Sequence, residues 1–147
     1  MEDISIEGII LQNLINNTSF ARQSIPFIKE DYFTDQSNKV VFRFIDHYFR
    51  KNNNLPEKNI LLIETKESED VSPKDIQNIT EVINSIYNSE SINDTKWLLE
   101  TAEKWCQDRE MYISIVKAIS IYDGSDSTIP TSAIPDLMKN ALSISFK

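Results

Sequence analysis

Apolar residues recur at intervals of three and four positions along most of this chain, which is the spacing that places them on one face of an α-helix. Glycine is scarce, and the chain has only Gly8 and Gly124. β-Sandwiches and nucleotide-binding α/β folds use glycine at turns and at phosphates. The pattern therefore predicts an all-α protein.

The first 90 residues are predicted to form a globular helical bundle, with helices at about 6–16, 19–25, 36–51, from Pro56 to a charged loop at 66–71, and from 72 to about 88. Thr34 or Asp35 can cap the third helix, because a short polar side chain accepts hydrogen bonds from the first free amides. In the helix that follows Pro56, we expect Ile60, Leu61 and Ile63 to face inward.

Residues 91–147 show a different pattern. Asn93 can cap a helix that meets no obvious break until Gly124, about 30 residues later, and such a helix is roughly 45 Å long. A shorter helix is expected from Ala133 or Pro135 to about Leu142. Two helices joined by a short loop normally pack antiparallel. This part is therefore predicted to be a helical hairpin, followed by the start of a linker.

The long helix carries a heptad-like seam, which consists of Leu98, Ala102, Trp105, Arg109, Tyr112, Val116 and Ile119. Past Met111 the apolar residues spread round the helix, and such a helix needs partners on most sides. Those partners are either the chain's own core or a second copy. We expect a second copy, with a candidate interface of Trp105, Arg109, Tyr112, Ile115, Val116, Ile119, Tyr122, Leu137, Met138 and Ala141.

Arg109 is the one charged residue on this seam, and two interpretations are open. Its stem could pack while the guanidinium reaches water or Glu110. Alternatively, it pairs with a carboxylate of another subunit and sets the register between the two helices.

The net charge is −8, and no block of Lys or Arg stands out. Tight binding to a DNA backbone requires clustered cations that release counterions. Trp97 and Trp105 are expected in the core or the interface rather than stacked on bases, because no basic groove accompanies them. The chain is therefore not expected to bind nucleic acid tightly by itself.

No catalytic, metal or cofactor site is expected. Neither glycine begins a phosphate-binding loop. His47 and Cys106 are too few ligands for a closed zinc site, and His47 is expected on the surface or at the edge of the core. The pair Glu100 and Glu103 is interpreted as a solvated helix face.

The chain is expected in the cytoplasm, with no membrane partner. Its one cysteine allows no intrachain disulfide, which fits a reducing compartment. No apolar run approaches the roughly 20 residues that span a bilayer. Glu2 and Asp3 follow Met1, which is not the basic start of a signal peptide.

Three stretches carry a family resemblance. Residues 7–46 contain an early helix, the acidic–aromatic turn Ile-Lys-Glu-Asp-Tyr-Phe at 28–33, and the helix Asn-Lys-Val-Val-Phe-Arg-Phe-Ile at 38–45. This order resembles the N-terminal domain of DnaB-type replicative helicases. Residues 97–111 and 133–146 are similar to the T-even bacteriophage members of that family, where the second stretch joins the N-terminal domain to the motor.

The resemblance implies a parent protein that is a ring-shaped hexamer and moves 5′ to 3′ on single-stranded DNA by nucleoside triphosphate hydrolysis. The N-terminal domains would form a collar, their hairpins would pair between neighbours, and the collar would help to dock primase. A helicase loader is a further expected partner. None of the family's catalytic residues maps onto this chain, so ATP and Mg²⁺ are expected only in a motor domain outside it.

Two other classes of protein remain open. The first is a free-standing phage replication adaptor with the same fold, such as a helicase loader or a primase-binding protein. The second is an unrelated helical enzyme or regulator. A phosphate-binding loop further along the same reading frame would separate the helicase domain from the adaptor.

Overall fold

The computed structural model describes residues 5–147, so Met1, Glu2 and Asp3, which bear on the signal-peptide argument, lie outside it. Within the described residues the chain is helical and contains no strand, which confirms the all-α prediction. The α-helices are α1 (Ile6–Asn16), α2 (Thr18–Ser24), α3 (Gln36–Asn52), α4 (Lys58–Glu67), α5 (Ile76–Asn88), α6 (Thr95–Tyr122) and α7 (Ile134–Leu142). Short 3-10 turns at Ile25–Phe27 (η1), Glu30–Tyr32 (η2), Pro73–Asp75 (η3) and Thr131–Ala133 (η4) join or precede them.

Side-chain caps define where several helices begin. Asp35 is the cap of α3, and its Oδ1 accepts a hydrogen bond of 3.0 Å from the Asn38 amide. Asp94 caps α6 by accepting from the Trp97 amide at 3.0 Å. The prediction that Asn93 caps this helix is therefore wrong by one residue, because it is the Asp94 carboxylate that reaches the free amide three positions later.

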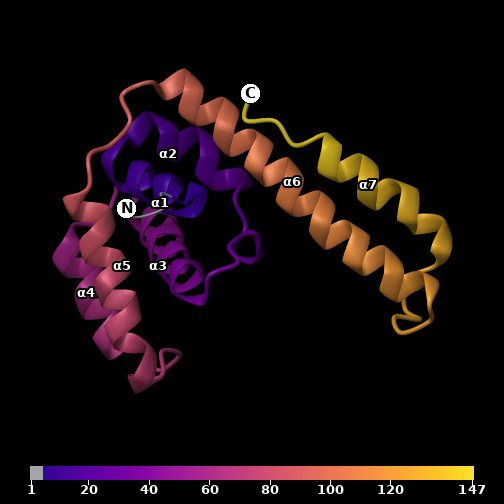
Figure 1. The fold of residues 1–147 in the computed structure, drawn as a ribbon, viewed down its shortest axis with the longest axis horizontal. Helices are drawn as coiled ribbons and strands as arrows, with labels where there is room; N and C mark the ends of the chain where they lie inside the picture. The colour runs from indigo at the N-terminus through magenta and orange to yellow at the C-terminus, as the bar shows by residue number, and fades with distance from the viewer. Residues whose placement is uncertain (1–4) are drawn as a thin grey trace.

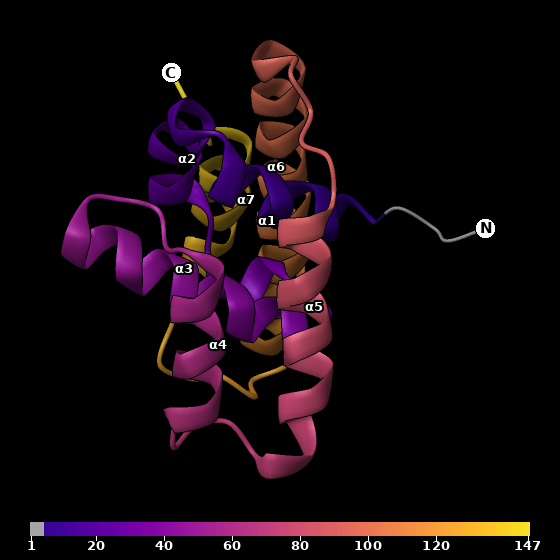
Figure 2. The same cartoon turned by 90° about the vertical axis from the view of Figure 1, so that its left-hand side faces the viewer.

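The first five helices form a bundle in which α1, α3 and α5 contact one another and α4 packs beside α5, as Figures 1 and 2 show. The largest fully buried side chains lie at its centre. They are Tyr32, Phe20, Phe33, Phe42, Ile10, Leu11, Leu14, Ile25, Ile45, Leu61, Ile79 and Ile83. Burying large apolar side chains is the main favourable term in forming such a core.

A buried carboxylate joins α1 to the start of α3. Glu7 accepts hydrogen bonds from the Thr34 amide at 3.0 Å, the Thr34 hydroxyl at 2.7 Å and the Asn38 side chain at 3.1 Å. Burial by itself raises the pKa of Glu7, but these bonds and one from the Asp35 amide lower it more, so the net pKa lies below its ordinary value. Glu7 is therefore a charged, fully bonded group inside the bundle.

The orientation of α4 differs from the prediction at one position. Leu61 is buried and Ile60 is partly buried, as expected, but Ile63 is 54% exposed. Ile63 comes two residues after Leu61, which corresponds to a rotation of about 200° around the helix axis, so the two side chains lie on opposite faces of α4. Thr65 takes the inward position instead, and Val71, which the sequence places in a charged loop, is also buried.

Helices α6 and α7 form the predicted hairpin, in which α7 runs back along the distal half of α6 (Figure 1). The core of the bundle continues into this part of the chain through Leu98, Ala102, Trp105 and Cys106 of α6 and through Phe146. A domain boundary near residue 90 therefore separates the bundle from the hairpin along the chain, but the hydrophobic core includes residues from both sides of it.

Candidate interaction surface

The proximal half of α6 packs on the chain's own bundle. Leu98, Ala102 and Trp105 are buried there. The Trp105 ring meets the Tyr32 ring edge-on, with centroids 6.0 Å apart, and the Phe33 ring at 5.0 Å. Such edge-to-face pairs add to the stabilisation that burial provides. This part of the predicted seam therefore belongs to the monomer.

Arg109 lies where α6 leaves the bundle, and its contacts are within the chain. Its Nε donates a hydrogen bond of 2.6 Å to the main-chain oxygen of Tyr32, and its guanidinium carbon lies 5.0 Å from the centre of the Tyr112 ring. Within the described residues the guanidinium therefore bonds the main chain of Tyr32 rather than Glu110. The alternative that it also pairs with a carboxylate of a second copy stays a prediction.

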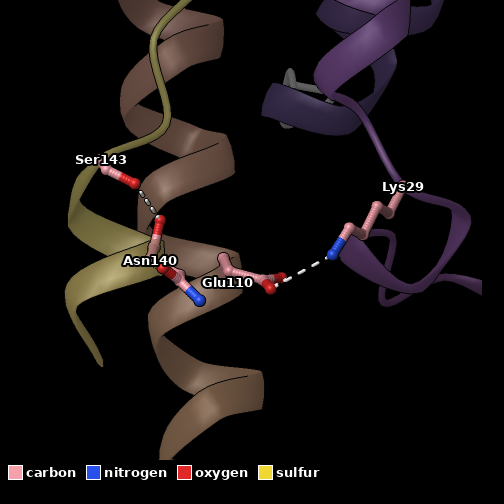
Figure 3. Close-up of polar contacts among 4 residues, drawn as sticks. All are labelled: Lys29, Glu110, Asn140 and Ser143. Carbon is pink, nitrogen blue, oxygen red and sulfur yellow. Dashed lines mark hydrogen bonds and ion pairs between the residues drawn. The ribbon is translucent and has the colours of Figure 1, made fainter. Parts of the chain in front are cut away.

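Glu110, the next residue, forms an ion pair of 3.2 Å with Lys29, which Figure 3 shows reaching across from the bundle to α6. Burial raises the pKa of the Tyr32 hydroxyl, and the nearby Glu110 carboxylate raises it further. Lys29 is mostly exposed, so the pair contributes little to stability. The junction depends instead on Arg109 and the aromatic contacts of Tyr32.

The distal half of α6 exposes large apolar side chains. We call this surface the hairpin face; it consists of Tyr112, Ile115, Val116, Ile119 and Tyr122, which are between 45% and 82% exposed. Steps of three and four residues place all five on one side of the helix. Ser114, Ala118 and Ile121 lie on another side and are buried. The interpretation that Val116 and Ile119 serve the monomer's own core does not fit their exposure.

Helix α7 contributes fewer exposed residues than the sequence suggests. Ala141 is fully buried, and Leu137 and Met138 are partly buried. Leu142, which the sequence interpretation did not single out, is 68% exposed. Leu142 comes four residues after Met138, and residues at that spacing are neighbours on a helix. The sequence spacing therefore indicates that Leu142 shares the face of α7 that carries Met138. We leave Trp105 and Ala141 out of the candidate surface because both lie in the interior of the chain.

Other side chains with possible chemistry are not assembled into a site. His47 is exposed and lines a groove of about 510 Å³ between α3 and α4, together with the cations Arg43 and Lys51 and the acids Glu64 and Asp70. This mixed charge favours no particular ligand. Among residues 5–147 no group of three or more His, Cys, Asp or Glu side chains is arranged to hold a metal ion.

Cys106 is buried, and Glu103 is hydrogen-bonded to a distant part of the chain. Burial, with a further contribution from Glu103 and Glu110, raises the pKa of the Cys106 thiol to about 12, so it stays protonated at neutral pH and is a poor nucleophile. The prediction that Glu103 lies on a solvated helix face is wrong, because its carboxylate is partly buried and accepts a hydrogen bond of 2.9 Å from the Phe146 amide.

None of the helices in the described part of the chain combines the length and the apolar character that crossing a membrane requires.

The fold and its surface define an all-α protein in which a helical bundle carries a hairpin with an apolar distal face. No protein-family model matches the chain. The chain is 27% identical, over 146 aligned positions, to the protein described as "DnaB-like replicative helicase" from Enterobacteria phage T4. The resemblance to a phage DnaB-type replicative helicase is thereby confirmed.

The match covers 94% of this chain but only 30% of the phage T4 protein. It indicates a domain related to a replicative helicase and is consistent with an N-terminal helicase domain. The chain spans less than a third of the length of this relative.

Proposed function

We propose that this chain is the non-catalytic N-terminal collar domain of a phage replicative DNA helicase and that copies of it associate through the hairpin face. The observation that carries the proposal is the row of five large apolar side chains on the distal half of α6, which remain between 45% and 82% exposed within residues 5–147. Contiguous apolar surface on a protein that is otherwise polar usually marks an interaction site.

The composition of the hairpin face supports a protein partner. Tyrosines stand at both ends, Tyr112 and Tyr122, and branched aliphatic side chains lie between them. Aromatic residues are enriched in the buried centres of protein interfaces, whereas Lys and Glu are depleted. Covering this row with the same row of a second copy removes apolar area from water on both sides, at about 25 cal/mol for each Å². The expected assembly is a dimer, or a hexamer built with further contacts.

The remaining roles come from the resemblance to the helicase family. Primase, and in addition a helicase loader, are the proposed protein partners of the collar. Single-stranded DNA is a partner only of the complete ring, and the 5′-to-3′ unwinding activity, with its ATP and Mg²⁺, is assigned to the motor domain outside this chain. The proposed location is the cytoplasm of the bacterial host.

A free-standing replication adaptor is the second candidate, because the match to the phage T4 helicase leaves 70% of that protein outside the alignment. The same hairpin face would then bind a helicase or a primase rather than another copy. Sequencing further along the reading frame separates the two candidates, since a phosphate-binding loop is expected there for the helicase and not for the adaptor.

Light scattering over a concentration series tests self-association directly. The chain has a mass of 17.0 kDa. We expect the measured mass to rise from this value toward that of a dimer or a hexamer as the concentration increases from low to several hundred micromolar. A mass of 17.0 kDa at every concentration would refute association through the hairpin face.

A further inference from the structure

The segment after α7 is extended and bound along α6 rather than free. The side chain of Gln107 donates a hydrogen bond of 2.8 Å to the main-chain oxygen of Ile144, and Glu103 accepts the Phe146 amide at 2.9 Å. Glu103 and Gln107 are four residues apart and so lie on the same side of α6. Together they bind both kinds of main-chain group of one tripeptide, and this fixes its direction along the helix.

Phe146 connects the same segment to the bundle. Its side chain is buried, and its ring stacks on that of Phe27 with centroids 5.5 Å apart and 22° between the planes. Phe27 belongs to η1, between α2 and α3, and is itself more than a third exposed even with Phe146 on it. Residues 143–147 thus contact the end of α7, the middle of α6 and the bundle.

Helix α7 packs along α6, but it is short and little of it is buried. It has nine residues, and an isolated helix of that length is unstable in water. No side chain caps its first turn, and only Ala141 is fully buried. Its last turn is closed by Ser143, whose amide donates to the Lys139 oxygen at 3.1 Å. The Ser143 hydroxyl also donates to the Asn140 oxygen at 2.8 Å, as Figure 3 shows. Ser143 is also the first residue of the bound segment.

We propose that residues 143–147 are a clasp that holds α7 against α6, and that opening the clasp weakens self-association through the hairpin face. The second part rests on the proposed function, whereas the first concerns the monomer alone. With the clasp open, α7 loses its fixed end, and the apolar side chains of Leu137, Met138 and Leu142 are no longer held beside α6. A partner must then order α7 as it binds, and ordering a segment lowers the affinity.

Hydrogen exchange in the full chain tests the clasp, with Phe146→Ala as the main variant. We expect the amides of α7 to exchange about tenfold faster or more, while those of α1, α3 and the proximal half of α6 keep their protection. Gln107→Ala, which leaves both aromatic rings in place, should accelerate the same amides to a smaller extent. Lys147→Ala changes an exposed residue of the same segment and should leave exchange unchanged.

Two outcomes would overturn the clasp. In the first, α7 exchanges at the wild-type rate in Phe146→Ala and in Gln107→Ala. In the second, the whole chain loses protection in both variants. Phe146 and Gln107 would then stabilise the entire fold rather than hold α7 locally.

Sedimentation of the same variants tests the link to association. We expect the dissociation constant of Phe146→Ala to rise about tenfold, because α7 must become ordered during binding. If α7 exchanges faster in Phe146→Ala but the dissociation constant is unchanged, the clasp exists and its proposed effect on self-association is refuted. If the wild-type chain is monomeric at every concentration, the proposed function fails, and the exchange experiment still decides whether the clasp exists.

Discussion

The Nε atom of Arg109 and the main-chain oxygen of Tyr32 are joined by a hydrogen bond of 2.6 Å. These residues are 77 positions apart, and their contact marks the point at which α6 leaves the bundle. Before it, Trp105 is buried against Tyr32; after it, Tyr112 is exposed. The contact thus separates the part of α6 that stabilises the monomer from the part that is available to a partner.

Removing this side chain should destabilise the monomer. Arg109→Ala deprives the Tyr32 oxygen of a charged donor, and the loss of such a bond at a partly buried site costs about 1–3 kcal/mol. Urea denaturation should show a lower free energy of unfolding by this amount. Lys96→Ala, a change of an exposed cation on the same helix, is the control. Equal stability of the two variants would mean that the Arg109–Tyr32 bond contributes nothing to the fold.

The hairpin face is tested by the double change Val116→Asp and Ile119→Asp. Burying an unpaired charge costs several kcal/mol, so the association constant should fall by at least about 100-fold. Both side chains are about half exposed in the monomer, so helicity by circular dichroism should be unchanged. The measurement is the mass by sedimentation.

Lys117→Asp is the matched control for this experiment, because it also makes the net charge more negative by two but lies outside the row of apolar side chains. It should associate like the wild type. If the double variant keeps its oligomeric mass with intact helicity, the interface lies elsewhere; if it loses all helicity, these positions support the monomer.

Stability should depend on pH through Glu7. The folded-state pKa of Glu7 lies below its ordinary value of 4.5, so its contribution is fully present above that value and is lost as the pH falls through the folded-state pKa. Glu7→Gln should lower the free energy of unfolding by about 1–3 kcal/mol at neutral pH, because a carboxamide accepts fewer hydrogen bonds. The difference should shrink in acid, where Glu7 itself becomes protonated.

Urea denaturation at a series of pH values measures this difference. Glu67→Gln, at an exposed carboxylate on α4, should show no comparable trend. A difference between Glu7→Gln and the wild type that stays constant from neutral to acid pH would exclude the charged form of Glu7 as the stabilising species.

The isolated chain should neither bind nor hydrolyse ATP, because its sequence has no phosphate-binding loop. Equilibrium dialysis and a phosphate-release assay measure the two activities. Saturable binding at micromolar ATP, in protein freed of contaminating ATPases, would contradict the assignment of nucleotide chemistry to a motor domain outside the chain.

Single-stranded DNA should bind the isolated chain weakly and without sequence preference, because the net charge is −8 and the cations are dispersed. Titration of a fluorescent oligonucleotide at near-physiological salt measures the affinity. A sub-micromolar dissociation constant for the monomer would show that the collar binds DNA without the ring.

The positions of the helices could be read from the sequence. The predicted first helix at 6–16 matches α1 to the residue, and the other helices begin or end within a few residues of their predicted bounds. Helix formation depends on residues within about four positions of one another and on a cap next to them. All of this information is local, so it is present in the pattern of apolar and polar positions.

The face that each helix buries was harder to predict. Ile63 follows the apolar pattern of α4 but is exposed, and Glu103 has the pattern of a solvated residue but is bound to Phe146. The contact between Glu103 and Phe146 joins residues 43 positions apart. Such a partner leaves no mark on the spacing of nearby residues, so the sequence pattern does not predict the clasp.

The sequence by itself determined that the chain is all-α, that residues 91–147 form a hairpin, and that a heptad-like seam, interrupted by the charged Arg109, runs along the long helix from Leu98 to Ile119. Only the tertiary structure decided that the seam before Arg109 is buried inside the monomer and that the seam after it is exposed. The physical reason is that periodicity records which side chains share a face of a helix, whereas burial depends on what is packed against that face. For Trp105 in the proximal half of α6 the packing partners include Tyr32 and Phe33, which are distant in sequence and come into contact only when the chain folds.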